Sequence, residues 1–222
     1  EQSQTLRLYL CRALGEFSIP TAIEPLVSCA QATADAQTAR AAVEALSVLT
    51  TNLIAADRAT DAPTAITDAA LAASRSKDAA LRSSAAFALG VIGGLGAAER
   101  LVELSNDPVE DVRFNSALGL ARLGQDDSLE ALVEMLALPD LPIADARTVD
   151  EAAQSKRYRR ALIVVNAVRG VALLVDATNQ SLPSHVRARV EALQQDPVAD
   201  VRSSAAALIK KMDRLKVDPT VQ

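Results

Sequence analysis

The sequence Asp-Pro-Val-X-Asp-Val-Arg occurs twice, from Asp107 to Arg113 and from Asp196 to Arg202. In both places it opens a segment whose apolar residues have helical spacing. A duplicated segment start indicates an internal repeat. A repeat constrains the fold strongly, because a short unit that cannot bury its own apolar face must stack against further copies of itself.

The arginine of the motif is a convenient origin for comparing copies. Arg113 is followed by Ala117, Leu120 and Leu123 at offsets of four, seven and ten residues, and Gly124 lies at offset eleven. The same pattern, with varying quality, starts at Arg7, Ala39, Arg82, Arg160 and Arg202. The chain therefore contains about six copies of one helix-sized pattern. The glycines at offset eleven, Gly93 and Gly124, are expected to end their helices in a left-handed conformation.

Shorter amphipathic segments lie between the copies, and their apolar residues are three and four apart. They span residues 19–30, 62–74, 96–105, 127–136 and 184–195. Each copy and the segment after it predict an antiparallel helix pair. The expected pairs span 3–32, 35–75, 78–105, 108–137 and 155–195, with a terminal helix at 198–215 and an insertion at 138–155. The predicted fold is all-α: a single α-solenoid domain, 1–222, of about five to six stacked pairs, of the armadillo type.

Composition agrees with closely packed helices. Half of the residues are apolar but only 2% are aromatic, so the core must be built from Ala, Leu, Val and Ile. The net charge of −5 argues against nucleic acid and against anionic membrane surfaces as partners. The most apolar stretch, 161–175, is interrupted by Asn166 and Arg169 and is too short to span a bilayer. A cytoplasmic location is expected, with a processed exported protein as the alternative.

The repeated motif has a structural interpretation. Asp107 and Asp196 are predicted to cap a helix, with Pro108 and Pro197 at the first helical position. Asp111 and Asp200 are placed to pair with an arginine of the neighbouring helix pair, which would form a ladder along the stack. The predicted structural positions are Arg82, Asp107, Asp111, Arg113, Asp196, Asp200 and Arg202. A polar binding site at these residues is the alternative.

Two consecutive segments, "LRSSAAFALGVIGGLGAAERLVEL" and "VRFNSALGLARLGQDDSLEALVEML", resemble HEAT repeats, in particular the short HEAT-like type of phycobilisome lyases. The resemblance covers nearly the whole chain and weakens toward both ends. It implies a noncatalytic scaffold that binds a protein or peptide. The alternative is a bilin-lyase-like or other enzyme-associated HEAT subunit that assembles with or regulates a catalytic protein. Deoxyhypusine hydroxylases, which are HEAT proteins, hold iron with His-Glu pairs, and one histidine cannot supply that ligand set.

The repeat is least regular at the insertion 138–155 and the basic run after it. Insertions in solenoids are often used for binding, and "KRYRR" is the densest positive charge in the chain. The predicted partner-binding residues are Arg147, Lys156, Arg157, Tyr158, Arg159 and Arg160. A tolerated surface loop and a solvated helix face are the alternatives. The surface formed by the second helices of the pairs is another candidate for binding.

Residues that carry chemistry are sparse. His185 is the only histidine, so neither a histidine pair for zinc nor the usual catalytic triad is expected. Cys11 and Cys29 lie on the two helices of the first expected pair and are predicted to be reduced thiols, with a disulfide as the alternative in an exported protein. The sequence therefore predicts no catalytic residue, no metal site and no cofactor, and the chain is not expected to be an enzyme.

Overall fold

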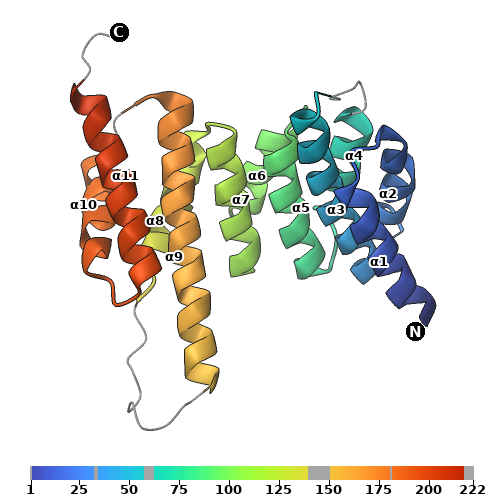
Figure 1. Cartoon of the computed structure of the whole chain (residues 1–222), viewed down its shortest axis with the longest axis horizontal. Helices are drawn as coiled ribbons and strands as arrows, with labels where there is room; N and C mark the ends of the chain where they lie inside the picture. The colour runs from blue at the N-terminus through green and yellow to red at the C-terminus, as the bar shows by residue number, and fades with distance from the viewer. Residues whose placement is uncertain (1, 33–34, 58–62, 140–150, 181, 218–222) are drawn as a thin grey trace. The chain divides into compact units, whose positions relative to one another are not determined.

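Every regular element in the described part of the chain is a helix. The computed structural model describes residues 2–32, 35–57, 63–139, 151–180 and 182–217 (Figure 1). These residues divide into two compact units, within Glu1–Gln125 and Asp126–Gln222. The all-α solenoid fold is confirmed. The division at Gln125 was not predicted, because the repeat pattern continues across it.

The N-terminal unit consists of two rows of helices. In the first row each helix packs against the next, and each helix of the second row packs against first-row helices on either side of it in the chain. The first row is α1 (Gln2–Glu16), α3 (Ala36–Ala55), α5 (Ala79–Ile92) and α7 (Glu110–Arg122), and the second is α2 (Ile23–Ala30), α4 (Pro63–Ala73) and α6 (Ala97–Leu104). A short 3-10 turn, Pro20–Ala22, precedes α2. This is the stacking of pairs that the repeat pattern predicts.

The C-terminal unit contains the remaining four α-helices of the described residues. They are α8 (Leu129–Leu136), α9 (Glu151–Thr178), α10 (Ser184–Ala192) and α11 (Ala199–Val217), with 3-10 turns at Asp126–Ser128 and Leu193–Gln195. Helix α9 packs against α8 and α11, and α10 packs against α8 and α11. At 28 residues, α9 is the longest described helix, and it begins inside the segment predicted to be an insertion. The rest of that segment, 140–150, lies outside the described residues.

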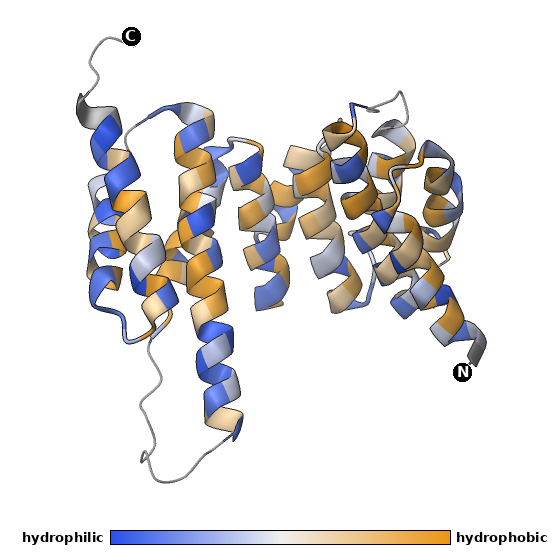
Figure 2. Ribbon diagram, viewed as in Figure 1, coloured by the Kyte–Doolittle hydropathy of each residue, from blue (hydrophilic) through white to orange (hydrophobic). Residues whose placement is uncertain are grey.

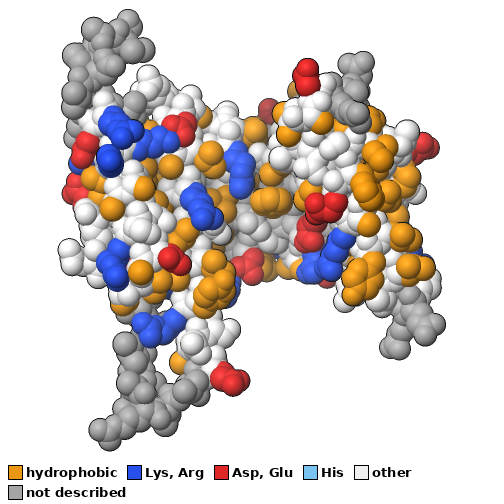
Figure 3. Space-filling view, viewed as in Figure 1, with side chains coloured by type: hydrophobic (Ala, Val, Ile, Leu, Met, Phe, Trp, Pro, Cys, Tyr) orange, Lys and Arg blue, Asp and Glu red, His pale blue; other side chains and the backbone are white. Residues whose placement is uncertain are grey.

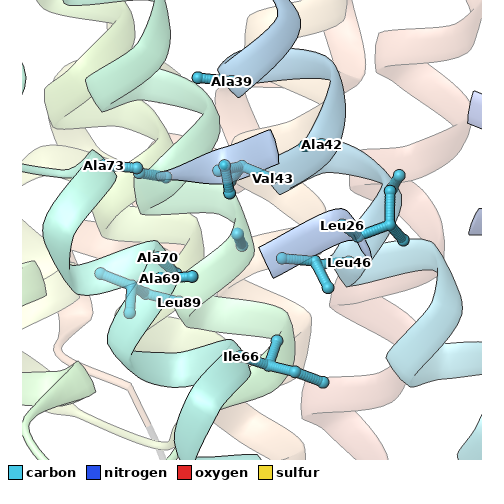
Figure 4. Packing of buried hydrophobic residues seen from close by; sticks show 14 of the residues in the cluster. Leu26, Ala39, Ala42, Val43, Leu46, Ile66, Ala69, Ala70, Ala73 and Leu89 are labelled. Atoms are coloured by element: carbon cyan, nitrogen blue, oxygen red, sulfur yellow. The ribbon is translucent and has the colours of Figure 1, made fainter. Parts of the chain in front are cut away.

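Small side chains let the first-row helices of the N-terminal unit approach each other closely. Leucines such as Leu26, Leu46 and Leu89 are fully buried, and alanines fill the space between them (Figure 4). Helices α5 and α7 meet at two glycines: a Cβ atom built on Gly90 would lie only 2.2 Å from the Cα atom of Gly119. The two backbones are therefore in direct contact, which no larger residue at position 90 allows.

The glycines at offset eleven have the predicted role. Gly93 follows α5 with a φ of 66°, and Gly124 has a φ of 70°. These are left-handed values that glycine adopts without the steric penalty that a Cβ atom imposes. The prediction of glycine-terminated helices is confirmed at both positions.

Helix α9 is, within the described ranges, the one helix whose length and composition would allow it to cross a membrane. Half of its most apolar 18-residue window is buried inside the protein. The buried residues include Val164, Val168 and Val171, and α9 packs against α8 and α11. A core helix of a helical repeat has the same length and composition. The helix is longer than the apolar stretch 161–175 on which the sequence-based expectation rested.

Candidate partner-binding site

The first turns of α9, which carry most of the basic run, are largely exposed. None of the residues 151–159 is buried, and Arg160 is the first buried residue of the helix. Within the C-terminal unit these turns project past the ends of α8 and α11 (Figure 1). Figure 2 shows that they are mainly hydrophilic, whereas the rest of the helix is more hydrophobic. Residues 156–159 of the basic run thus lie on an exposed extension of the helix.

Four of the predicted partner-binding residues lie on this extension. Lys156 and Arg159 are exposed, Arg157 is half-buried, and the Tyr158 side chain is 68% exposed. Arg147 lies outside the described residues. We refer to Lys156, Arg157, Tyr158 and Arg159 as the basic extension. It presents three cations and one aromatic ring along less than two turns of helix.

Arg160 does not belong to the exposed surface. It is 9% exposed, its Nη1 atom lies 2.5 Å from Oδ2 of Asp196, and its Nε atom donates a hydrogen bond to the carbonyl oxygen of Leu138 at 3.2 Å. The Asp196 side chain is only 3% exposed. Arg160 therefore ties α9 to the turn before α11 and to the end of α8. This corrects its assignment to the partner-binding set: as the origin of its repeat, it points into the unit.

The same type of pair recurs in the N-terminal unit. Nε and Nη2 of Arg82 donate to the two carboxylate oxygens of Asp107 at 2.8 and 2.9 Å. Arg7 and Asp35 form a longer pair, with 3.7 Å between Nη2 and Oδ2. We call Arg7–Asp35, Arg82–Asp107 and Arg160–Asp196 the arginine–aspartate ladder. Each rung joins the first helix of one repeat to the turn before the first helix of the next repeat.

The ladder uses the first aspartate of the repeated motif, whereas the sequence pointed to the second. Asp107 and Asp196 accept the rungs, and Asp111 contributes its backbone carbonyl oxygen as acceptor for the Ser83 hydroxyl at 3.2 Å. Asp200 accepts through its backbone carbonyl oxygen from Ser203 at 3.1 Å. The reason is geometric: Asp107 lies in the turn that faces α5, three residues before the helix begins at Glu110.

The predicted caps are also displaced by a few residues. The Asp107 side chain accepts from the Val109 N–H and the Asp196 side chain from the Val198 N–H, both at 2.9 Å. Each aspartate thus closes a turn ahead of the helix, and Pro108 lies in that turn, two residues before α7. Genuine side-chain caps occur elsewhere: Asp35 accepts from the Thr38 N–H, and Asp78 from the Leu81 N–H.

The arginines at the repeat origins also bind their own turns. Nη1 of Arg202 donates to the carbonyl oxygens of the two residues at the start of its motif, Asp196 and Pro197, at 2.7 and 2.9 Å. Arg113 makes the same contacts with Asp107 and Pro108, and Arg82 with Ser76 and Lys77. The arginine of the motif therefore satisfies carbonyl groups that precede the helix, a role that the sequence alone did not reveal.

Hydrogen bonding controls the ionisation of the ladder acids. The hydrogen bonds from Arg82, aided by the Val109 N–H, hold the pKa of Asp107 below its usual value against the opposing effect of burial. Hydrogen bonds from the hydroxyl and N–H of Thr38 and from Gln4 lower the pKa of Asp35 to about 2. Both carboxylates therefore remain ionised in moderately acidic solution.

We expect the stability of the protein to depend on pH through Asp107. Because its pKa is lower in the folded state, the stabilisation is complete above the unfolded-state value of about 3.9 and is lost as pH falls through the lower folded-state value. Asp107→Asn should therefore flatten the dependence of the free energy of unfolding on pH below about pH 5, measured by urea unfolding. Glu99→Gln, at an exposed acid, is the control and should follow the wild type; equal slopes for all three proteins would contradict the assignment.

The candidate chemical residues do not converge on one place. Cys11 is buried on α1, Cys29 is half-buried on α2, and both thiols are free. Burial, together with the nearby Cys29, raises the pKa of Cys11 to about 11, so its thiolate is scarce at neutral pH. His185 is exposed near the start of α10. Across the described ranges, no group of three His, Cys, Asp or Glu side chains is arranged to hold a metal ion.

Comparisons with known proteins give one family match. The family model for HEAT repeats matches residues 66–151. An engineered protein solved by the Northeast Structural Genomics Consortium is 20% identical, with a TM-score of 0.49, over 94% of this chain and 90% of that one. Human deoxyhypusine hydroxylase in complex with glycerol is 16% identical, with a TM-score of 0.41, over 95% of this chain and 80% of that one. No curated protein matches the sequence.

The family match and the architecture agree. Residues 66–151 include helices α5, α6, α7 and α8, whose sequences carry the repeat most clearly. HEAT repeats generally form modules on which other proteins assemble, so the coarse functional class is a protein-interaction scaffold. Over residues 66–151 this chain matches the HEAT-repeat family, and its described helices stack in the manner of HEAT-like repeats.

Proposed function

We propose that this protein is a noncatalytic binding module and that its basic extension receives an acidic peptide segment of a partner protein. The observation that carries the proposal is the exposure of the extension: the side chains of Lys156, Tyr158 and Arg159 are exposed, on helical turns that contain no buried residue. A helix that extends past its own core must be stabilised by something other than that core, and a partner can supply the missing contacts.

The distribution of charge supports an acidic partner. Residues 151–217 contain twelve Lys and Arg against six Asp and Glu, whereas the rest of the chain contains eleven against twenty-two. Inside the C-terminal unit, ion pairs engage Arg160 with Asp196, Arg187 with Glu191 and Asp213, and Lys211 with Asp176. The basic extension adds three cations, Lys156, Arg157 and Arg159, to this positive balance. It therefore offers positive charge to a carboxylate-rich segment.

Tyr158 adds a contact that charge alone does not provide. Its side chain is 68% exposed and is flanked in sequence by Arg157 and Arg159. Tyrosine and arginine are over-represented among the residues that dominate binding energy at protein interfaces. An acidic segment that also carries an apolar residue would match this combination of cations and ring.

The noncatalytic part of the proposal rests on the described side chains. They supply no clustered metal ligands, the one histidine is exposed on α10, and the buried thiol of Cys11 has a raised pKa. A nucleophile or a general base would need a partner group and a pKa suited to its task.

The test is a binding titration with a fluorescent peptide rich in Asp and Glu and containing one Leu, followed by anisotropy. The charge reversal K156E/R159E should weaken binding by about tenfold or more, and the wild-type affinity should fall as salt increases. The matched control K210E/R214E reverses two exposed charges on α11 and should change the affinity by about twofold at most. Equal weakening by both variants, or binding that does not respond to salt, would contradict the proposed site.

A further inference from the structure

Helix α1 carries a line of apolar side chains on its outer face. Leu6 and Leu10 are 59% and 53% exposed, Ala13 continues the same line, and Phe17, the first residue after the helix, is 54% exposed. Figure 3 shows hydrophobic side chains gathered on the surface over this helix. The four residues are separated by four, three and four positions, which is the spacing of a seam between two helices. We call them the α1 seam.

The core of the N-terminal unit does not account for the α1 seam. The opposite face of α1 makes the contact with α3: Cys11 is buried, Leu8 and Leu14 pack against the core, and a Cβ atom on Gly15 would lie 2.9 Å from Ala45. On a helix with 3.6 residues per turn, this inward face and the seam lie on opposite sides. Helix α1 is therefore apolar on two faces, and the unit itself covers only one.

The α1 seam also differs from the surface that one repeat presents to the preceding repeat. At the positions two and three residues after each repeat origin, the first-row helices that follow α1 have small or short polar residues. These are Ala41 and Ala42 on α3, Ser84 and Ala85 on α5, and Asn115 and Ser116 on α7. They permit close contact, as when Ser84 donates to Glu44 at 2.7 Å and Asn115 to Ser83 Oγ at 2.8 Å.

At these two positions α1 has Tyr9 and Leu10. Tyr9 is 65% exposed and Leu10 is 53% exposed. Side chains of this size would hold a neighbouring helix farther away than the contacts between α1, α3, α5 and α7 permit. The α1 seam consequently suits a helix that packs through interlocking side chains.

We propose that the α1 seam binds the α1 seam of a second copy of this chain, with the two helices antiparallel. The spacing four, three, four is the same in either direction, so a two-fold axis superposes the seam on itself. It places Leu10 opposite Ala13 of the second copy and Leu6 opposite Phe17. A parallel pair would place Ala13 opposite Ala13 and leave a void there. The symmetric spacing of the seam, and the match of the large Leu10 with the small Ala13, favour a second copy of this chain as the partner.

Polar groups beside the α1 seam are compatible with this arrangement. Tyr9 and Glu16 lie on the same flank of the seam, and both are exposed. In an antiparallel pair the same flanks of the two helices meet, so the Tyr9 hydroxyl can donate to the Glu16 carboxylate of the second copy. Four apolar layers form a small interface, so we expect a reversible dimer with a dissociation constant on the order of 10 µM.

Sedimentation velocity of the full chain tests the dimer. The wild type should shift from monomer to dimer between about 1 and 200 µM, and L10E should remain monomeric because two carboxylates would be buried in the seam. L95E is the matched control, since Leu95 is 93% exposed and lies outside the seam; it should dimerise like the wild type. Circular dichroism establishes that both variants are folded. A wild type that stays monomeric, or an L10E variant that still dimerises, would overturn the proposal.

Mixing two variants tests the antiparallel orientation. L10K and A13E should each be monomeric alone, because each places charges opposite apolar side chains. In an equimolar mixture the introduced ammonium faces the introduced carboxylate, and a heterodimer should form with at least a tenfold gain in affinity over either variant alone. A parallel pair does not bring these positions together. If the wild type dimerises and the mixture does not, the antiparallel arrangement is wrong.

Discussion

Gly90→Ala is expected to lower the free energy of unfolding by about 3 kcal/mol, although alanine is the better helix former by about 1 kcal/mol. The new methyl carbon would lie 2.2 Å from the Cα atom of Gly119, and a backbone atom cannot move away as the tip of a side chain can. Helices α5 and α7 would have to separate along their contact. Helix propensity predicts that Gly90→Ala raises the free energy of unfolding, whereas packing predicts that it lowers it. The sign of the measured change decides between them.

Gly119→Ala provides the comparison from the other side of the same contact. Its nearest neighbour would be the Cδ1 atom of Leu101 at 2.9 Å, the end of a flexible side chain, and the Gly90 Cα atom would be 3.2 Å away. The loss should therefore be smaller, about 1 kcal/mol. Urea unfolding followed by circular dichroism measures both changes. A Gly90→Ala protein as stable as the wild type would show that α5 and α7 are not in backbone contact.

Arg160→Ala is expected to cost about 4 kcal/mol, because it leaves the carboxylate of Asp196 without its cation. That carboxylate is 3% exposed, so water cannot replace the guanidinium group, and the hydrogen bond to the Leu138 carbonyl oxygen is lost as well. Arg159→Ala, one residue earlier on the exposed face, should change the stability by about 0.5 kcal/mol at most. The contrast between the neighbours separates a structural arginine from a surface arginine.

The double variant R160M/D196L tests whether the instability of Arg160→Ala comes from the unpaired charge of Asp196. It removes both charges and fills the space with apolar side chains, so it should recover most of the stability lost by Arg160→Ala. Thermal unfolding of Arg160→Ala, Arg159→Ala and R160M/D196L gives the order of their stabilities. If the double variant is as unstable as Arg160→Ala, the cost arises from the lost hydrogen bonds to Leu138 and Val198 and not from the unpaired charge.

The helix pairs could be predicted because their signals are local. Apolar spacing and the terminating glycines Gly93 and Gly124 depend only on nearby residues, and the structure has helices at those places and a positive φ at both glycines. The acid that forms the rung with Arg82 could not be predicted in this way. Asp107 and Asp111 are four residues apart in the same motif, and their distances from α5 depend on how the turn before α7 folds.

The candidate site was predictable in part for a similar reason. A basic run predicts an exposed helix face, and Lys156, Tyr158 and Arg159 are exposed. Arg160 is the next residue, but its burial depends on Asp196, which is 36 residues away in sequence. No pattern within the run distinguishes it from its neighbours. The comparison that could have identified it is the repeat register, in which Arg160 and Arg82 occupy the same position.

The ladder has a consequence for how such an array can grow or shrink. The segment 82–112 contains both members of one rung, Arg82 and Asp107. A tandem duplication of this segment would therefore copy a complete rung together with its helices. Gene duplication and unequal recombination could therefore change the number of repeats in a protein of this kind without a new interface having to evolve each time.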